Sequence, residues 1–158
     1  MAEFAEYMEA LAIALGQELP ECEGGRTAFL IDDLPYEIRW DEAGVQLYVY
    51  CVLGAVPESE EARARLCEAL LHAQYCFCES GGFSFGLSHD NTYLMLQQLF
   101  APSLGGEAVF VRRMDTFVKT ANVWRRRLAE LLEESKNEDE EAGEGPAPES
   151  PSMFTMRV

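Results

Sequence analysis

Residues 26–53 read RTAFLIDDLPYEIRWDEAGVQLYVYCVL. Apolar and polar residues alternate through most of this stretch, which is the period of two expected of strands with one buried face. The polar segments DDLP and DEAG interrupt the alternation with residues typical of tight turns. The stretch therefore predicts a three-stranded antiparallel meander, with strands at 27–31, 36–40 and 45–53.

Helical periodicity flanks this meander on both sides. Apolar residues recur at steps of three and four over residues 2–16, from about 59 to 80, and from 107 to 134. Alternation returns at 83–87, and residues 92–99 read as a further strand after the polar turn at 88–91. The order α-β-β-β-α-β-β-α, with strands in hairpin-linked runs, predicts an α+β fold with a mainly antiparallel twisted sheet packed by helices.

Two of these elements leave a question open. The last helix carries a heptad-like apolar seam, which either packs inside the chain or forms a dimer seam. The strand at 92–99 is apolar on both faces, so we expect both of its faces to be covered.

Aromatic residues on the polar side of a strand have two interpretations. They either pack in a core that covers both faces, or they form a surface where an extended peptide adds to the sheet.

Charge and composition narrow the possible partners. The 158 residues include 28 acidic and 12 basic side chains, which gives a net charge of −16. Such a chain repels nucleic-acid phosphates and anionic membranes, so neither is an expected partner. We expect residues 1–134 to form one domain and residues 135–158 to form a disordered acidic tail, rich in Pro, Gly and Glu, with an apolar end. Within that end, Met153, Phe154 and Met156 are candidates to fold back onto a binding groove.

The sequence offers little for catalysis or export. Its N-terminus, MAEFAEYMEA, lacks the basic region of a secretory signal, and no apolar run approaches a membrane span. The odd count of five cysteines is typical of reduced thiols, so we expect a cytoplasmic protein. On a helix, Cys76 and Cys78 would face opposite sides, which disfavours a metal site with Cys67 and His72. We predict no catalytic residue, metal or cofactor; a small metal or thiol enzyme is the least favoured alternative.

Three segments carry a family resemblance: LCEALLHAQ at 66–74, GGFSFGLSHDNTYLMLQQL at 81–99, and FVKTANVWRRRL at 117–128. In their order and spacing they resemble the class I type III secretion chaperones, the CesT/SycE-like family. The resemblance covers about residues 2–132. One departure is Gln74, where the family often has Asn.

The resemblance implies a non-enzymatic cytoplasmic homodimer. Such a chaperone binds the N-terminal segment of a secreted effector and keeps it soluble, extended and competent for export without ATP. An alternative in the same fold is a regulator that sequesters a transcriptional control factor. The resemblance implies client contacts along the first helix and first strands, at Phe4, Leu11, Phe29, Ile31, Tyr48 and Tyr50. It implies a dimer interface on the second helix and the strand after it, at Leu66, Leu70, Ala73, Phe77, Phe83 and Phe85.

Overall fold

The structure is a computed structural model that describes residues 2–43 and 45–143. The observed order confirms the predicted α+β fold, with two short 3₁₀ turns (η1 and η2) added. The elements are α1 (Ala2–Leu15), β1 (Arg26–Ile31), β2 (Leu34–Asp41), β3 (Gln46–Ala55), α2 (Glu60–Gln74), η1 (Tyr75–Phe77), β4 (Ser84–Leu87), β5 (Tyr93–Phe100), η2 (Pro102–Leu104) and α3 (Glu107–Gly143). The fold-back candidates Met153, Phe154 and Met156 lie outside the described residues.

The strands form one antiparallel five-stranded sheet in the order β1-β2-β3-β5-β4. Asp32 and Asp33 join β1 to β2 with φ values of 51° and 63°. Left-handed backbone of this kind suits a two-residue hairpin turn, and Asp tolerates it better than most residues. The turn sets the register in which Ile31 pairs with Leu34. The two ends of the sheet, β1 and β4, are edge strands.

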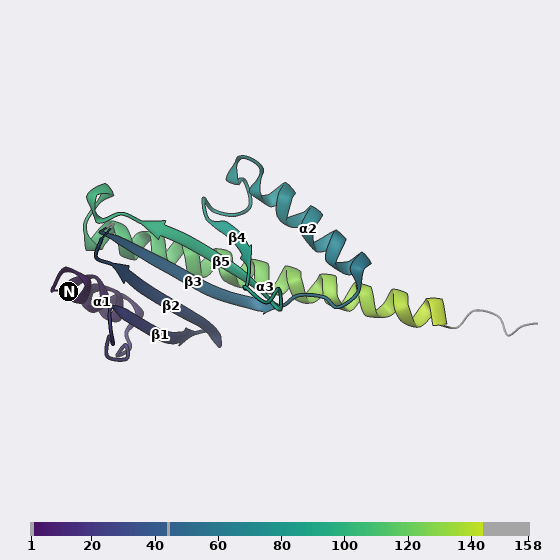
Figure 1. Ribbon diagram of the computed structural model, residues 1–158, viewed down its shortest axis with the longest axis horizontal. Helices are drawn as coiled ribbons and strands as arrows, with labels where there is room; N and C mark the ends of the chain where they lie inside the picture. Colours follow the sequence, from purple (N-terminus) through teal and green to yellow (C-terminus); the bar gives the residue numbers. More distant parts are fainter. Residues whose placement is uncertain (1, 44, 144–158) are drawn as a thin grey trace, which may run out of the picture.

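Helices α1 and α3 cover one face of the sheet, and α3 runs along its back in Figure 1. Alternate residues of the strands point into this face and are buried. Tyr7 of α1 packs edge-on against Phe100 of β5 and Phe110 of α3, which joins all three elements in one core. Helix α2 stands to one side of the sheet, beyond β4 (Figure 1).

The apolar seam of α3 packs inside the chain, which decides between the two possibilities left by its heptad-like pattern. Six of its seven members are at most 2% exposed: Phe110, Met114, Phe117, Ala121, Trp124 and Leu128. The seventh, Leu131, is half-buried and packs against the core. The helix continues to Gly143, so the end predicted at Glu134 was too early. The boundary between domain and tail remains a prediction.

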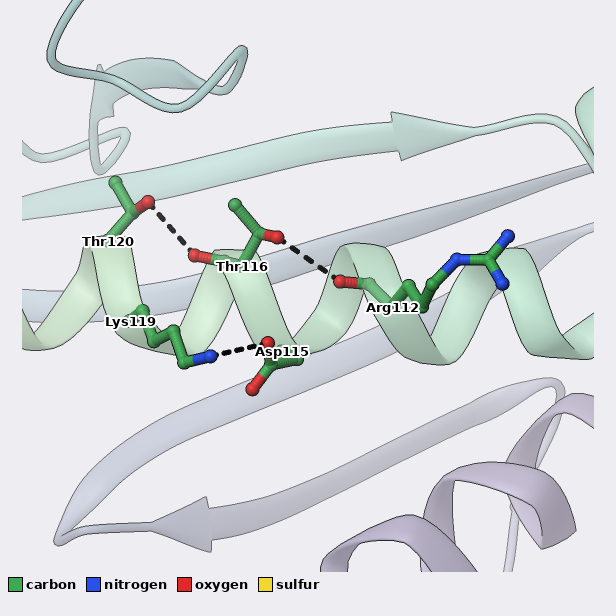
Figure 2. A network of polar contacts seen from close by, with 5 residues as sticks. All are labelled: Arg112, Asp115, Thr116, Lys119 and Thr120. Carbon is green, nitrogen blue, oxygen red and sulfur yellow. Dashed lines mark hydrogen bonds and ion pairs between the residues drawn. The ribbon is translucent and has the colours of Figure 1, made fainter.

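Much of the hydrogen bonding on the solvent side of α3 is internal to the helix. Lys119 Nζ lies 2.7 Å from Asp115 Oδ2, one turn away. The hydroxyls of Thr116 and Thr120 donate to the carbonyls of Arg112 and Thr116, four residues earlier, as Figure 2 shows. Because these side chains bond within their own helix, they favour a structural role for α3 over a role in binding a partner.

Helix α2 ends earlier than the periodicity predicted. The stripe of apolar residues suggested a helix to about residue 80, but α2 stops at Gln74 and a 3₁₀ turn follows. Cys76 and Phe77 have left-handed backbone, with φ of 51° and 54°. Local bonds close the turn, from Cys78 N to the Tyr75 carbonyl and from Glu79 N to the Ala73 carbonyl. A tertiary contact adds to them, because Trp124 Nε1 donates to the Glu79 carbonyl at 3.0 Å.

Removing the Phe117 ring should destabilise the whole domain. The ring is fully buried and packs edge-on against Tyr36 and Phe83. Phe117→Ala should lower the free energy of unfolding by about 3–5 kcal/mol, as large-to-small changes in cores do. Urea denaturation would measure it. Val123→Ala, at a position 51% exposed on the same helix, is the control and should change stability by no more than about 0.5 kcal/mol.

Candidate protein-binding surfaces

The face of the sheet opposite α1 and α3 is open and largely apolar. On β3, the rings of Tyr48 and Tyr50 stack in parallel, with centroids 6.4 Å apart. Leu30 of β1 is 60% exposed and Leu99 of β5 is 50% exposed. The registers place all four side chains on the same face. Tyr48 pairs with both Arg39 and Leu99, and Leu30 pairs with Pro35, which lies on the same side of β2 as Arg39. No described helix covers this face, contrary to the expectation that the strand at 92–99 would be covered on both sides.

A hollow of about 580 Å³ lies on this open face. We call it the sheet-face hollow. Its lining includes apolar side chains of four strands and the charged pair of β2: Ala28, Pro35, Tyr50, Val52 and Met95, with Glu37 and Arg39. Glu37 lies 2.5 Å from Arg26 and 4.0 Å from Arg39, so its charge is compensated. Ser88, His89 and Gln97 also line it, so the hollow offers both apolar surface and polar groups to the side chains of a polypeptide.

Strand β1 presents a partly free edge beside this face. Trp40 N donates to the Gly25 carbonyl at 2.7 Å, which identifies a hydrogen-bonded pair at that position of the β1–β2 ladder. Such pairs alternate along antiparallel strands. The main-chain groups of Thr27, Phe29 and Ile31 therefore point towards β2, and those of Ala28 and Leu30 point outwards.

The opposite edge of the sheet is partly blocked by Gln74 at the end of α2. Its side-chain amide donates to the Phe83 carbonyl at 3.1 Å and accepts from the Phe85 N–H at 3.3 Å. The amide thus pairs with β4 much as a neighbouring strand would. Strand β4 is also shorter than β1, with four residues against six, so β1 is the better edge for strand addition.

A second apolar surface lies on α2, η1 and β4. Leu71 and Tyr75 are 73% and 75% exposed, and Phe77 and Leu87 are 53% and 45% exposed. Beside them is a hollow of about 330 Å³, the α2–β4 hollow, lined by Cys67, Leu70, Leu71, Phe85, Leu87 and Leu94. Large apolar side chains gathered in this way are typical of a protein–protein contact.

Comparison with protein families matches residues 7–125 to the model of the Tir chaperone protein (CesT) family. The chain belongs to the CesT family. The match spans the chain from α1 into α3, and it confirms the resemblance to type III secretion chaperones. Comparison with curated protein sequences gave no match.

Solved structures show the same fold as this CesT family protein. A chain of the HopA1–SchA chaperone–effector complex has a TM-score of 0.60 at 16% identity, covering 78% of this chain and 93% of that one. A chain of the ExoU–SpcU complex, from the type III secretion system of Pseudomonas aeruginosa, also scores 0.60 at 16% identity, covering 80% and 97%. For the ExsC–ExsE complex the score is 0.61 at 13% identity, covering 79% and 95%.

The structure does not bring the six predicted client-binding residues of this CesT family protein together. Phe4 and Leu11 are each 1% exposed and belong to the core, where Phe4 stacks on Trp40. Phe29 is buried and Ile31 half-buried, both on the face that α1 and α3 cover. Only Tyr48 and Tyr50 lie on the open face. The alternation of β1, β2, β3 and β5 already contained the residues that sequence reasoning missed there: Ala28, Leu30, Pro35, Val52, Met95 and Leu99.

The predicted dimer residues also divide between core and surface. Leu66, Ala73 and Phe83 are at most 2% exposed and hold α2 and β4 against the domain. Leu70 and Phe85 are half-buried and line the α2–β4 hollow, and Phe77 is exposed. The missed residues are Leu71, Tyr75 and Leu87, and the helical step from Cys67 to Leu71 to Tyr75 was a usable signal for the first two.

The thiols differ in their environment. Burial raises the pKa of Cys51 from 9.0 to about 12, and burial also raises the pKa of the neighbouring Tyr36 hydroxyl. Cys67, Cys76 and Cys78 are exposed. Among residues 2–43 and 45–143, no group of three or more His, Cys, Asp or Glu side chains is placed to hold a metal ion. In the same residues, no helix combines the length and apolar character of a membrane span.

The raised pKa of Cys51 predicts a loss of stability in alkali. Below pH 9 the thiol is neutral in both the folded and unfolded states. Between pH 9.0 and about 12 the unfolded chain releases this proton and the folded chain retains it, so unfolding becomes easier as pH rises. Thermal unfolding over this range should therefore show a shallower loss for Cys51→Ala than for the original chain. Equal slopes would contradict the assignment, and Cys67→Ala, at an exposed thiol, serves as the control.

Proposed function

We propose that this CesT family protein is a cytoplasmic homodimeric chaperone that binds the N-terminal segment of a type III secreted effector. It keeps that segment soluble, extended and competent for export, and it uses no ATP. The observation that carries the proposal is the combination of an open apolar sheet face with an adjoining partly free edge strand. The chaperone–effector complexes of similar fold support the proposal.

An extended client segment would add to the edge of β1. Main-chain hydrogen bonds to Ala28 and Leu30 would supply affinity that does not depend on the client's sequence. Client side chains on the open side would lie over Leu30 and the sheet-face hollow, near Tyr50. Those on the other side would lie near Ile31, at the margin of the core. This arrangement assigns the client a strand conformation, which is the non-compact state that export requires.

Dimerisation would use the α2–β4 surface. The exposed Leu71 and Leu87 line the α2–β4 hollow, and Leu71 also lines a neighbouring hollow with Tyr75. The same surface therefore offers both projecting side chains and a space to receive them. A two-fold dimer needs such a self-complementary patch. A stable interface buries about 800 Å² on each partner, and four large apolar side chains of these elements are at least 45% exposed.

Charge placed on the open face should weaken client binding. Leu30→Asp would put an unpaired carboxylate under the client strand and should reduce affinity at least about tenfold, or ~1.4 kcal/mol. Tyr50→Ser should weaken binding in the same direction by removing a wall of the hollow. The probe is the N-terminal segment of the protein that co-purifies with this chain and is identified by mass spectrometry, co-expressed and measured by calorimetry. Val123→Asp on α3 is the control, and an equal loss there would argue against the open face.

The identity of the bound protein separates the proposal from its alternative. Recovery of a secreted effector supports the chaperone function. Recovery of a transcriptional control factor on the same surface would favour the regulator instead.

Charge on the α2–β4 surface should separate the dimer without unfolding it. Leu71 is 73% exposed, so Leu71→Asp should cost the folded chain little and an apolar interface a great deal. We expect the original chain to sediment as a dimer and Leu71→Asp as a monomer at the same concentration. Val123→Asp should remain dimeric. A strictly monomeric original chain would overturn the dimer proposal.

A further inference from the structure

Gln17 occupies one end of the free β1 edge. Its side-chain Nε2 donates to the Leu30 carbonyl at 3.3 Å. The position of Gln17 is fixed by the end of α1, where Gly16 has a φ of +66° and donates to the Ile13 carbonyl, and Gln17 N donates to the Ala12 carbonyl. This pair of bonds is the Schellman arrangement that commonly ends helices. The helix end thus directs the Gln17 side chain along the strand edge.

The other end of the edge is closed by a tight turn. Arg26 N donates to the Glu23 carbonyl and Glu23 N donates to the Arg26 carbonyl, each at 3.0 Å. Arg26, Ala28 and Leu30 together direct six main-chain groups outwards. Arg26 uses both of its groups in this turn and Leu30 shares its carbonyl with Gln17. Within the described residues, the N–H and carbonyl of Ala28 and the N–H of Leu30 remain open.

We propose that Gln17 is a guard of the client-binding edge. It covers the Leu30 carbonyl while β1 is empty, and it moves aside when an extended client segment pairs along the strand. This inference rests on the proposed function and adds the residue that regulates access to the site. The only occupant it requires is a polypeptide in strand conformation, which supplies a main-chain N–H where the Gln17 amide now lies.

The bond has the properties of a replaceable guard. Its length of 3.3 Å is beyond the usual range for N–H···O, and the Gln17 side chain is exposed and free to rotate into water. A client N–H held in line by its own strand replaces it at small cost. In the empty protein the guard removes an acceptor that would otherwise invite another copy to pair edge to edge.

Removing the guard should strengthen client binding. The probe is the N-terminal segment of the protein that co-purifies with this chain, measured by calorimetry against the full chain. Gln17→Ala and Gln17→Met both lack the donor, and Met keeps the length of the side chain. Each should bind about two- to tenfold tighter, because the client no longer displaces a hydrogen bond. Glu18→Gln, which alters the next exposed side chain, should bind within about twofold of the original. Unchanged or weaker binding by both Gln17 variants would overturn the proposal.

Amide hydrogen exchange separates this inference from the proposed function. In the chain alone, the amides of Ala28 and Leu30 should exchange quickly and those of Thr27 and Phe29 slowly; slow exchange at Ala28 and Leu30 would show that the edge is not free and would overturn the inference. In the complex, Ala28 and Leu30 should become protected. A complex that forms without this protection overturns the guard and leaves the chaperone function standing. Failure of the segment to bind overturns both.

Discussion

The packing of the α3 seam against one face of the sheet is the constraint on which the other features depend. A single long helix, assisted by α1, can cover only one side of five strands. The fourth and fifth strands complete the sheet, but α2 stands beyond β4 and does not turn back over the second face (Figure 1). Apolar side chains on that face, such as Leu30 and Leu99, remain exposed in the described chain. One-sided burial thus creates the surface on which the proposed function rests.

Helix α3 also fixes the loops that border this surface. Asn122 Nδ2 donates to Asp32 Oδ2 at 2.9 Å, and the Arg125 guanidinium donates to the Asp32 carbonyl at 2.7 Å. These bonds hold the β1–β2 turn against the helix. At the other side of the sheet, Arg127 pairs with Glu79 and stacks over the Trp124 ring. Helix α3 therefore packs in the core and also holds the β1–β2 turn and the segment before β4 in place. This gives the edge of β1 a rigid support.

Local periodicity was enough to predict the elements, because the spacing of apolar residues within a segment shows whether it forms a helix or a strand. It was not enough to predict how α2 ends, since the segment after Gln74 is also held by Trp124, 45 residues further along the chain than Glu79, to whose carbonyl it donates. The site was only half predictable for a related reason. Phe4 and Leu11 mark the apolar side of α1, but an apolar stripe does not tell whether the protein's own core or a partner covers it. Tyr48 and Tyr50 were recognisable because β3 has a second, fully buried row beside them.

The order of strands separates the two proposed interfaces. Strand β1 and strand β4 lie at opposite edges of the sheet, so a dimer formed through α2 and β4 leaves β1 free in each copy. The Gln74 bridge on β4 and the Gln17 contact on β1 use the same chemistry, a side-chain amide that satisfies a strand edge, with different consequences. Gln74 makes two bonds from a half-buried position and stabilises its strand as a permanent part of the fold. Gln17 makes one long bond from an exposed position, so the edge that it covers is the one that a client strand opens.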